Sequence, residues 1–87
     1  ISSYMTGGET QQAIAIVLII TAPGKEQIVF EALDELSSIS EKYLLFGEYD
    51  IFAKLVCGDY GELSNTVVSK IRSIQGVEAT KTLTAAP

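Results

Sequence analysis

The sequence predicts an α+β fold in which the unit βαβ occurs twice, and two observations lead to this prediction. Sliding the chain by 35 positions places apolar residues on apolar residues, for example Leu18 on Ala53 and Leu33 on Val68. Each half also reads as a strand, a turn, a helix, a turn and a strand, which is a recurring supersecondary arrangement. The 87 residues suffice for one domain. We therefore expect the order βαββαβ in a four-stranded antiparallel sheet.

The first strand is expected at Ala13–Thr21, where both faces are apolar and both must be covered. The following helix is expected to begin near Pro23, because proline is tolerated in the opening turn of a helix. Its buried stripe should consist of residues at helical spacing, namely Ile28, Val29, Ala32, Leu33, Leu36 and Ile39.

The second helix has a clear start signal. Asp59 can cap free backbone N–H groups, and Glu62, three residues later, can reach back toward the cap. Gly76 suits the left-handed residue that follows the end of a helix. The buried face of this helix should consist of Leu63, Val67, Val68, Ile71 and Ile74.

The strands around the second helix carry polar residues that need an explanation. Lys54 lies within the expected strand Ile51–Cys57 and would need a partner or a sheet edge. The last strand, residues 77–85, places Thr80, Thr82 and Thr84 on one face. Threonine is a good strand former on a half-exposed surface, so the row can be purely structural. The alternative is a row of hydroxyl groups that faces a ligand.

The connections determine the expected topology. Two right-handed βαβ crossovers place both helices on the same face of the sheet, with the first strand in a central position. The other face then lacks a cover within one chain. Since the first strand is apolar on both faces, we expect the protein to be an oligomer.

Composition argues against several functions. The net charge is −5 and the basic residues are scattered, which argues against direct binding of nucleic acid. One cysteine, Cys57, and no histidine leave no internal disulfide, no zinc site and no Cys-His nucleophile pair. The apolar run 13–20 is far shorter than the ~20 residues that cross a bilayer. We expect a cytoplasmic protein that is not an enzyme and has no metal, cofactor or membrane partner.

The candidate site is the bend Gly47-Glu48-Tyr49-Asp50, which lies between two apolar runs. A free amino acid presents an ammonium and a carboxylate, so its pocket needs carboxylates for the first and N–H or hydroxyl donors for the second. Asp50 or Glu48 can take the ammonium, Gly47 can give a backbone N–H, and Thr80 or Thr82 can add hydroxyls. The opposing interpretation is an ordinary turn, because glycine and aspartate are common turn residues.

These features together resemble a known family. They are the doubled βαβ pattern, the bend with Ala53-Lys54 after it, the turn Ile74-Gln75-Gly76-Val77 and the stretch Thr80-Lys81-Thr82. Over about residues 13–83 they resemble the effector module of the Lrp/AsnC family, called the RAM domain. The resemblance implies a ferredoxin-like fold and sheet-to-sheet dimers that form an α/β-barrel-like assembly. It further implies octamers or similar rings with amino acids bound between dimers.

The resemblance also implies a role in transcription regulation and a place for the bend at or near the effector pocket. Together with the chemistry above, it makes the expected ligand-binding residues Gly47, Glu48, Tyr49, Asp50, Thr80 and Thr82. Residues 1–12 are polar and are expected to be a flexible tail before a RAM-like domain at 13–87. Family regulators carry a helix-turn-helix domain before this module, which twelve residues cannot build. We therefore expect either a stand-alone form that can partner with a DNA-binding relative or a fragment of a longer protein.

Two other functions remain open at this point. The chain can be a ligand-free oligomerisation scaffold, in which the bend is only a turn. It can also be a small dimeric α/β-barrel enzyme, because such enzymes share the fold. The absence of histidine makes catalysis harder, since Tyr49 and Asp50 would need strongly shifted pKa values to act as acid and base.

Overall fold

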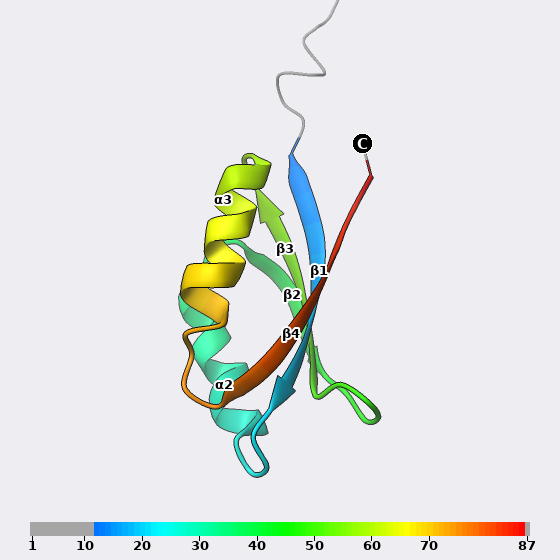
Figure 1. The fold of residues 1–87 in the computed structure, drawn as a ribbon, viewed down its shortest axis with the longest axis vertical. Coiled ribbons are helices and arrows are strands. Elements are labelled where there is room, and N and C mark those ends of the chain that lie inside the picture. Colours follow the sequence, from blue (N-terminus) through cyan, green and yellow to red (C-terminus); the bar gives the residue numbers. More distant parts are fainter. Residues whose placement is uncertain (1–11, 87) are drawn as a thin grey trace, which may run out of the picture.

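The computed structural model describes residues 12–86 and shows one sheet that is covered on one side by two helical segments (Figure 1). The elements follow the predicted βαββαβ order of a ferredoxin-like fold. In chain order they are β1 (Ala13–Thr21), α2 (Glu26–Ala32), the 3₁₀ segment η2 (Leu33–Glu35), β2 (Ile39–Leu44), β3 (Ile51–Cys57), α3 (Tyr60–Asn65), the π-helical segment η3 (Thr66–Ile71) and β4 (Val77–Thr84). The predicted tail lies outside the described residues, apart from Gln12.

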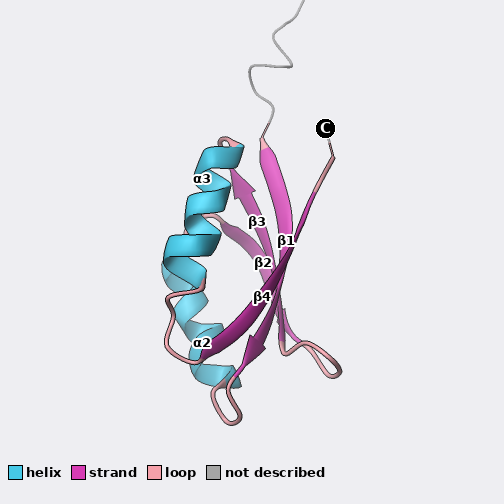
Figure 2. Ribbon diagram, viewed as in Figure 1, coloured by secondary structure: helices cyan, strands magenta, loops and turns pink. Residues whose placement is uncertain are grey.

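The sheet is antiparallel, with the strand order β2-β3-β1-β4, which confirms the central position of β1. Ile19 of β1 pairs with Ile51 on one side and with Thr80 on the other. Figure 2 shows that both helical segments lie on the same side of this sheet, as the crossover rule predicts. β2 and β4 are therefore the edge strands.

The core lies between the sheet and the helices. Alternate residues of β1 are buried because the side chains of a strand point to its two faces in turn. Val17 and Ile19 are fully buried, and so are Ile51 and Leu55 of β3. The helical segments close the core with Val29, Leu33, Leu63, Val67 and Ile71.

The first helix differs from the prediction at both ends. α2 begins at Glu26, because the Lys25 N–H donates to the Ala22 carbonyl at 2.9 Å and closes a turn over Pro23 and Gly24. The predicted stripe was wrong at Ile28, which is 57% exposed, because Val29 and Leu33, four residues apart, form the inward face. The stripe was also wrong at Ile39, which starts β2.

The second helix confirms its predicted cap. The Asp59 carboxylate accepts from the Glu62 N–H at 2.7 Å, and the Glu62 carboxylate accepts from the Gly58 N–H at 2.9 Å. Gly76 has φ +106°, as predicted for the residue past a helix end. The prediction was wrong at Val68, which is 54% exposed, because Leu63, Val67 and Ile71, spaced four residues apart, form the inward face.

The second face of the sheet has no cover from the described residues. The alternate residues of β1, Ile14, Ile16, Leu18 and Ile20, are only half-buried there, as is Phe52 of β3. Leu83 of β4 pairs with Ile16 and is 48% exposed. Lys54 lies on this open face. Its ammonium group has the kind of partner that the sequence predicted, the Glu41 carboxylate at 3.7 Å.

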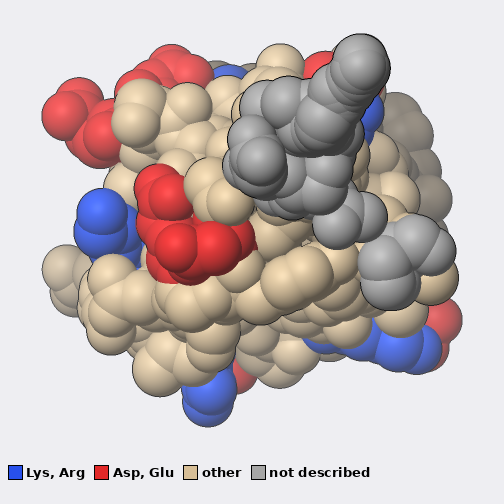
Figure 3. Space-filling model, turned by 90° about the horizontal axis from the view of Figure 1, so that it is seen from above, with Lys and Arg blue, Asp and Glu red and all other residues tan. Residues whose placement is uncertain are grey.

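Charged side chains of both signs are mixed on the face seen in Figure 3. In the view of Figure 3, lysine and arginine side chains are separated from one another and acidic side chains lie between them. None of the described helices has the length and apolar character needed to cross a membrane.

Candidate functional site

The bend between β2 and β3 forms as a hydrogen-bonded loop. The Leu45 N–H donates to the Asp50 carbonyl at 2.9 Å and closes the loop at its base. Gly47 has φ +138°, a conformation that L side chains rarely adopt. Gly47 and Glu48 are exposed, and Phe46 is fully exposed beside them. The loop therefore presents a carboxylate and an aromatic ring to the surroundings of the molecule.

Asp50 ties this loop to the end of β1. Its Oδ2 accepts a hydrogen bond from the Thr21 N–H at 2.8 Å and another from the Thr21 hydroxyl at 3.3 Å. The Asp50 N–H donates to the Ile19 carbonyl at 2.9 Å. The Asp50 side chain thus has a structural role, while Oδ1 makes no hydrogen bond to the described residues.

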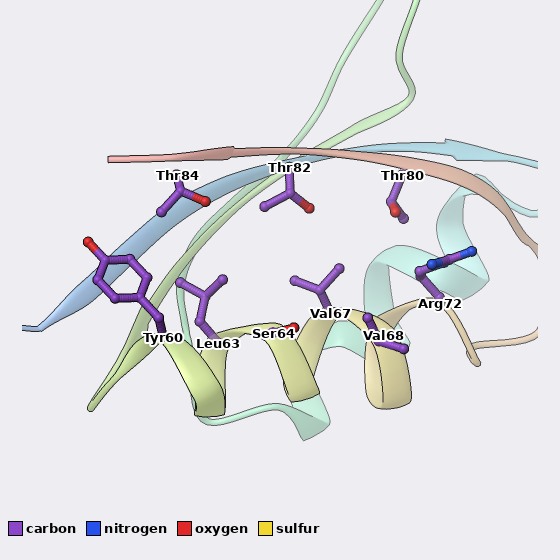
Figure 4. A pocket seen from close by; sticks show the side chains of 9 residues that line it. All are labelled: Tyr60, Leu63, Ser64, Val67, Val68, Arg72, Thr80, Thr82 and Thr84. Carbon is purple, nitrogen blue, oxygen red and sulfur yellow. The ribbon is translucent and has the colours of Figure 1, made fainter. Parts of the chain in front are cut away.

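The threonines of β4 line a groove. Thr80, Thr82 and Thr84 point toward α3 and η3, as Figure 4 shows, and the groove between them has a volume of about 480 Å³. The helical wall consists of Tyr60, Leu63, Ser64, Val67, Val68 and Arg72. The groove therefore has hydroxyl groups on the strand side, a mainly apolar helical side and one guanidinium at its end.

The structure does not bring all predicted site residues together. Gly47, Glu48, Tyr49 and Asp50 share the loop between β2 and β3, which projects away from the helices in Figure 1. Thr80 and Thr82 face the helices from β4, at the other edge of the sheet from β2. Within one chain the candidate site therefore consists of two separate halves.

Sequence reasoning missed Arg72 and Tyr60 as groove residues. Tyr60 donates its hydroxyl to the Ala85 carbonyl at 3.2 Å and so connects α3 to the end of β4. Arg72 follows Ser64 and Val68 at spacings of four residues, and all three line the groove, so helical spacing is the signal that could have found it. The third threonine, Thr84, was visible in the sequence as part of the row.

No group of three potential metal ligands occurs in the part of the chain that the structure describes. Cys57 is a buried free thiol at the end of β3. The two halves of the candidate site offer carboxylates, hydroxyls, a guanidinium and apolar walls, which are groups that can contact a small polar molecule.

A comparison with protein families identifies the class to which this module belongs. The profile of the Lrp/AsnC ligand binding domain matches residues 14–86. The chain belongs to the Lrp/AsnC family, whose members among the matched proteins carry the names of transcription regulators.

Two curated relatives show the extent of this similarity. The regulatory protein AsnC of Escherichia coli (strain K12) is 33% identical over 51 residues, which cover 59% of this chain and 34% of AsnC. An uncharacterized HTH-type transcriptional regulator of Pyrococcus abyssi is 28% identical over 71 residues, which cover 82% of this chain and 45% of the regulator. The matched region thus spans less than half the length of either relative.

Solved structures agree in fold. FFRP-DM1 is 32% identical with a TM-score of 0.82, and the alignment covers 85% of this chain and 99% of that one. TTHA0845 from Thermus thermophilus is 37% identical with a TM-score of 0.81, over 86% of this chain and 94% of that one. The regulator NMB0573 of Neisseria meningitidis, solved as a complex with L-Met, is 14% identical, has a TM-score of 0.78 and is aligned over 94% of this chain and 54% of that one. The last comparison shows the fold alone.

Proposed function

We propose that this chain is a regulatory module that binds a free amino acid at contacts between subunits and thereby changes subunit assembly. Its influence on transcription then passes through a DNA-binding member of the same family. Membership of the Lrp/AsnC ligand binding family and the regulatory names of the relatives support this class of function. The regulator of Neisseria meningitidis with the same fold was solved with L-Met, an effector of the proposed kind.

The observation that carries the proposal is the separation of the two halves of the candidate site. Glu48 and Asp50 lie on a loop that projects away from the helices, whereas Thr80 and Thr82 line a groove beneath them. One chain cannot surround a small ligand with both sets. A bend from one subunit and a groove from a second subunit can do so, and this makes ligand binding depend on assembly.

The chemistry of the two halves suits an amino acid. The exposed Glu48 carboxylate and Asp50 Oδ1, which has no hydrogen bond to another described residue, can accept hydrogen bonds from an ammonium group. Gly47 and Tyr49 complete the loop, where the absence of a side chain at Gly47 lets a ligand approach the backbone. Thr80 and Thr82 add hydroxyl donors on the groove side.

The open face of the sheet supplies the primary contact between subunits. Ile14, Ile16, Leu18 and Ile20 form an apolar row on this face, and exposed apolar surface of this kind favours association. A second copy placed face to face covers both sheets and gives the α/β-barrel-like dimer. Contacts between such dimers, in octamers or similar rings, then bring a bend beside a groove.

A thermal-shift screen of the twenty amino acids tests the proposal. A ligand present at 100 times its Kd stabilises the folded protein by about 2.7 kcal/mol. We expect one amino acid, or a few of similar shape, to raise the Tm and to change the mass measured by light scattering. A protein whose Tm responds to none of the twenty would contradict amino-acid sensing.

A ligand-free oligomerisation scaffold is the second candidate, and one observation favours it. The Asp50 carboxylate already accepts two hydrogen bonds from Thr21, which accounts for the residue without a ligand. A scaffold would show the expected oligomer in light scattering and no response in the thermal-shift screen, so the same pair of measurements separates the two functions.

A further inference from the structure

We infer that Arg72, with Thr80 beside it, binds the α-carboxylate of the effector, opposite the acidic bend that a second subunit contributes. This inference rests on the proposed function, because it assigns one pole of the same ligand. In this assignment Arg72 makes the groove a carboxylate site, a role that the sequence pattern did not predict.

The first support is the position of Arg72. It lines the groove beneath the threonine row, and it also lines an adjoining polar hollow with Glu78 and Thr80. Thr80 is the threonine common to both hollows. In Figure 4 the Arg72 side chain lies at the same end of the groove as Thr80. The Arg72 guanidinium and the Thr80 hydroxyl thus lie together at one end of the otherwise mainly apolar groove.

The second support is the absence of an internal partner. Within residues 12–86 the ion pairs are Lys42 with Asp34 and Lys54 with Glu41, and Arg72 takes part in neither. Glu78, which lines the adjoining hollow, forms no ion pair with it. An arginine remains charged at all physiological pH values and presents a planar fork of N–H donors that matches a carboxylate. The fork is therefore available to a carboxylate from outside the chain.

The third support is the local backbone. The Arg72 N–H donates to the Val67 carbonyl at 3.0 Å, five residues back, which is the hydrogen-bond spacing of a π-helix. Ser64, Val68 and Arg72 follow one another at spacings of four residues and all line the groove, so this helical wall continues as far as Arg72. Isolated π segments frequently occur at functional sites.

The complementarity of charge points to a zwitterion. The bend offers the Glu48 and Asp50 carboxylates and the groove offers the Arg72 guanidinium, so the two halves carry opposite charge. An amino acid bridging two subunits would direct its ammonium to the bend and its carboxylate to Arg72. Its side chain would then contact the apolar wall at Leu63, Val67 and Val68. A phosphate is the poorer fit, because the groove has a single cation.

Matched variants and analogues test this assignment. Arg72→Met removes the guanidinium and keeps the bulk of the side chain, and Lys70→Met removes a charge from the same helical segment at a residue that lines neither hollow. The probes for calorimetry are L-leucine, L-leucinamide, L-glutamate and L-glutamine. Leucinamide keeps the ammonium of leucine and lacks its carboxylate.

We expect Arg72→Met to weaken binding of a responsive probe by about 10- to 150-fold, the loss of one hydrogen-bonded charge contact, and Lys70→Met to leave it unchanged. Leucinamide should bind the wild type as weakly as leucine binds the Arg72→Met variant. If only glutamate loses affinity and glutamine does not, Arg72 binds a side-chain carboxylate and the α-carboxylate assignment is wrong.

The failure of this inference is distinct from the failure of the proposed function. If Arg72→Met binds all four probes like the wild type while Asp50→Asn weakens them, amino-acid sensing stands and the role of Arg72 is refuted. If no amino acid binds the wild type, isovalerate, a carboxylate with a branched apolar tail, is titrated instead. If isovalerate binds the wild type but not the Arg72→Met variant, Arg72 is a carboxylate site and amino-acid sensing is refuted. If isovalerate does not bind the wild type, amino-acid sensing and the role of Arg72 are both refuted.

Discussion

Asp50 and Thr21 are 29 residues apart in the chain, yet the Asp50 carboxylate accepts the Thr21 N–H at 2.8 Å. This contact joins the loop between β2 and β3 to the last residue of β1. Only 5% of the surface of Thr21 is exposed, so water cannot readily replace Asp50 as the acceptor of its N–H. A residue that looks like an ordinary turn aspartate in the sequence is therefore a link between two parts of the sheet.

Asp50→Ala should lower the free energy of unfolding by about 1.5 to 3 kcal/mol, because a hydrogen bond to a charged acceptor is lost and a buried N–H is left without a partner. Under the proposed function the same change should weaken amino-acid binding by about 10- to 150-fold, since it also removes a partner of the ammonium. Urea denaturation and calorimetry measure the two effects separately.

Two variants separate the structural role of Asp50 from its proposed role in binding. Asp50→Asn keeps an oxygen acceptor for Thr21 and removes the charge, so it should retain more stability than Asp50→Ala while binding an amino acid weakly. Glu48→Ala changes an exposed carboxylate in the same loop and should alter stability by no more than about 0.5 kcal/mol. An Asp50→Ala variant as stable as the wild type would contradict the link to Thr21.

Two glycine-to-alanine changes should act in opposite directions. At Gly76, with φ +106°, an added Cβ would lie 3.0 Å from Val29 Cγ2 and 3.2 Å from Lys25 Cβ. Strain and crowding together should therefore cost about 1 to 3 kcal/mol of stability. At Gly61, inside α3, the nearest atom is the Asp59 carboxylate at 3.4 Å, and alanine should stabilise by up to about 1 kcal/mol. Thermal unfolding of both variants checks the signs, and a neutral Gly76→Ala would contradict the close approach of this turn to α2.

The strands could be predicted from the sequence more accurately than the helices. The expected ranges of β1 and β3 were confirmed. β1 could be recognised as a short apolar run with two apolar faces, which is typical of a buried strand. The Asp59 cap was also predictable, since it depends on residues three apart. The helical stripes failed at Ile28 and Val68, because the inward face of each helical segment is a single row of residues four apart. These rows are Val29 with Leu33, and Leu63 with Val67 and Ile71.

The candidate site was less predictable because it depends on contacts between distant segments. The bend could be recognised from its own residues, but the partner of Asp50 lies at the end of β1. The threonine row could be recognised from alternation, while its helical wall and Arg72 depend on how α3 and η3 pack over β4. Local patterns cannot specify that packing.

The isolated chain should not bind duplex DNA. Its net charge is −5, and lysine and arginine side chains are separated from one another on the face that Figure 3 shows, whereas phosphate binding needs clustered cations that release counterions. A gel-shift assay at moderate salt should show free DNA at every protein concentration tested. A sequence-selective complex that weakens as salt rises would overturn this expectation.

The open face of the sheet should hold two chains together at micromolar concentration. Ile16 lies in the apolar row of this face, next to Leu83 of β4 and Lys54 of β3. Ile16→Asp would place a charged carboxylate in an apolar interface, beside a lysine that already pairs with Glu41. The variant should therefore dissociate the assembly to a monomer of 9.3 kDa, as measured by light scattering. The wild type should show at least twice that mass.

The matched control for Ile16→Asp is Ile28→Asp, which makes the same change at an isoleucine that is 57% exposed on α2, on the opposite side of the sheet. This variant should keep the wild-type mass, because the face-to-face contact does not involve α2. Since Ile16→Asp can also unfold the chain, circular dichroism of both variants must show folded protein, and Leu18→Lys provides a second disruption of the same face. The face-to-face contact would be refuted if both variants of this face are folded and keep the wild-type mass. It would also be refuted by a wild type that is monomeric throughout the micromolar range.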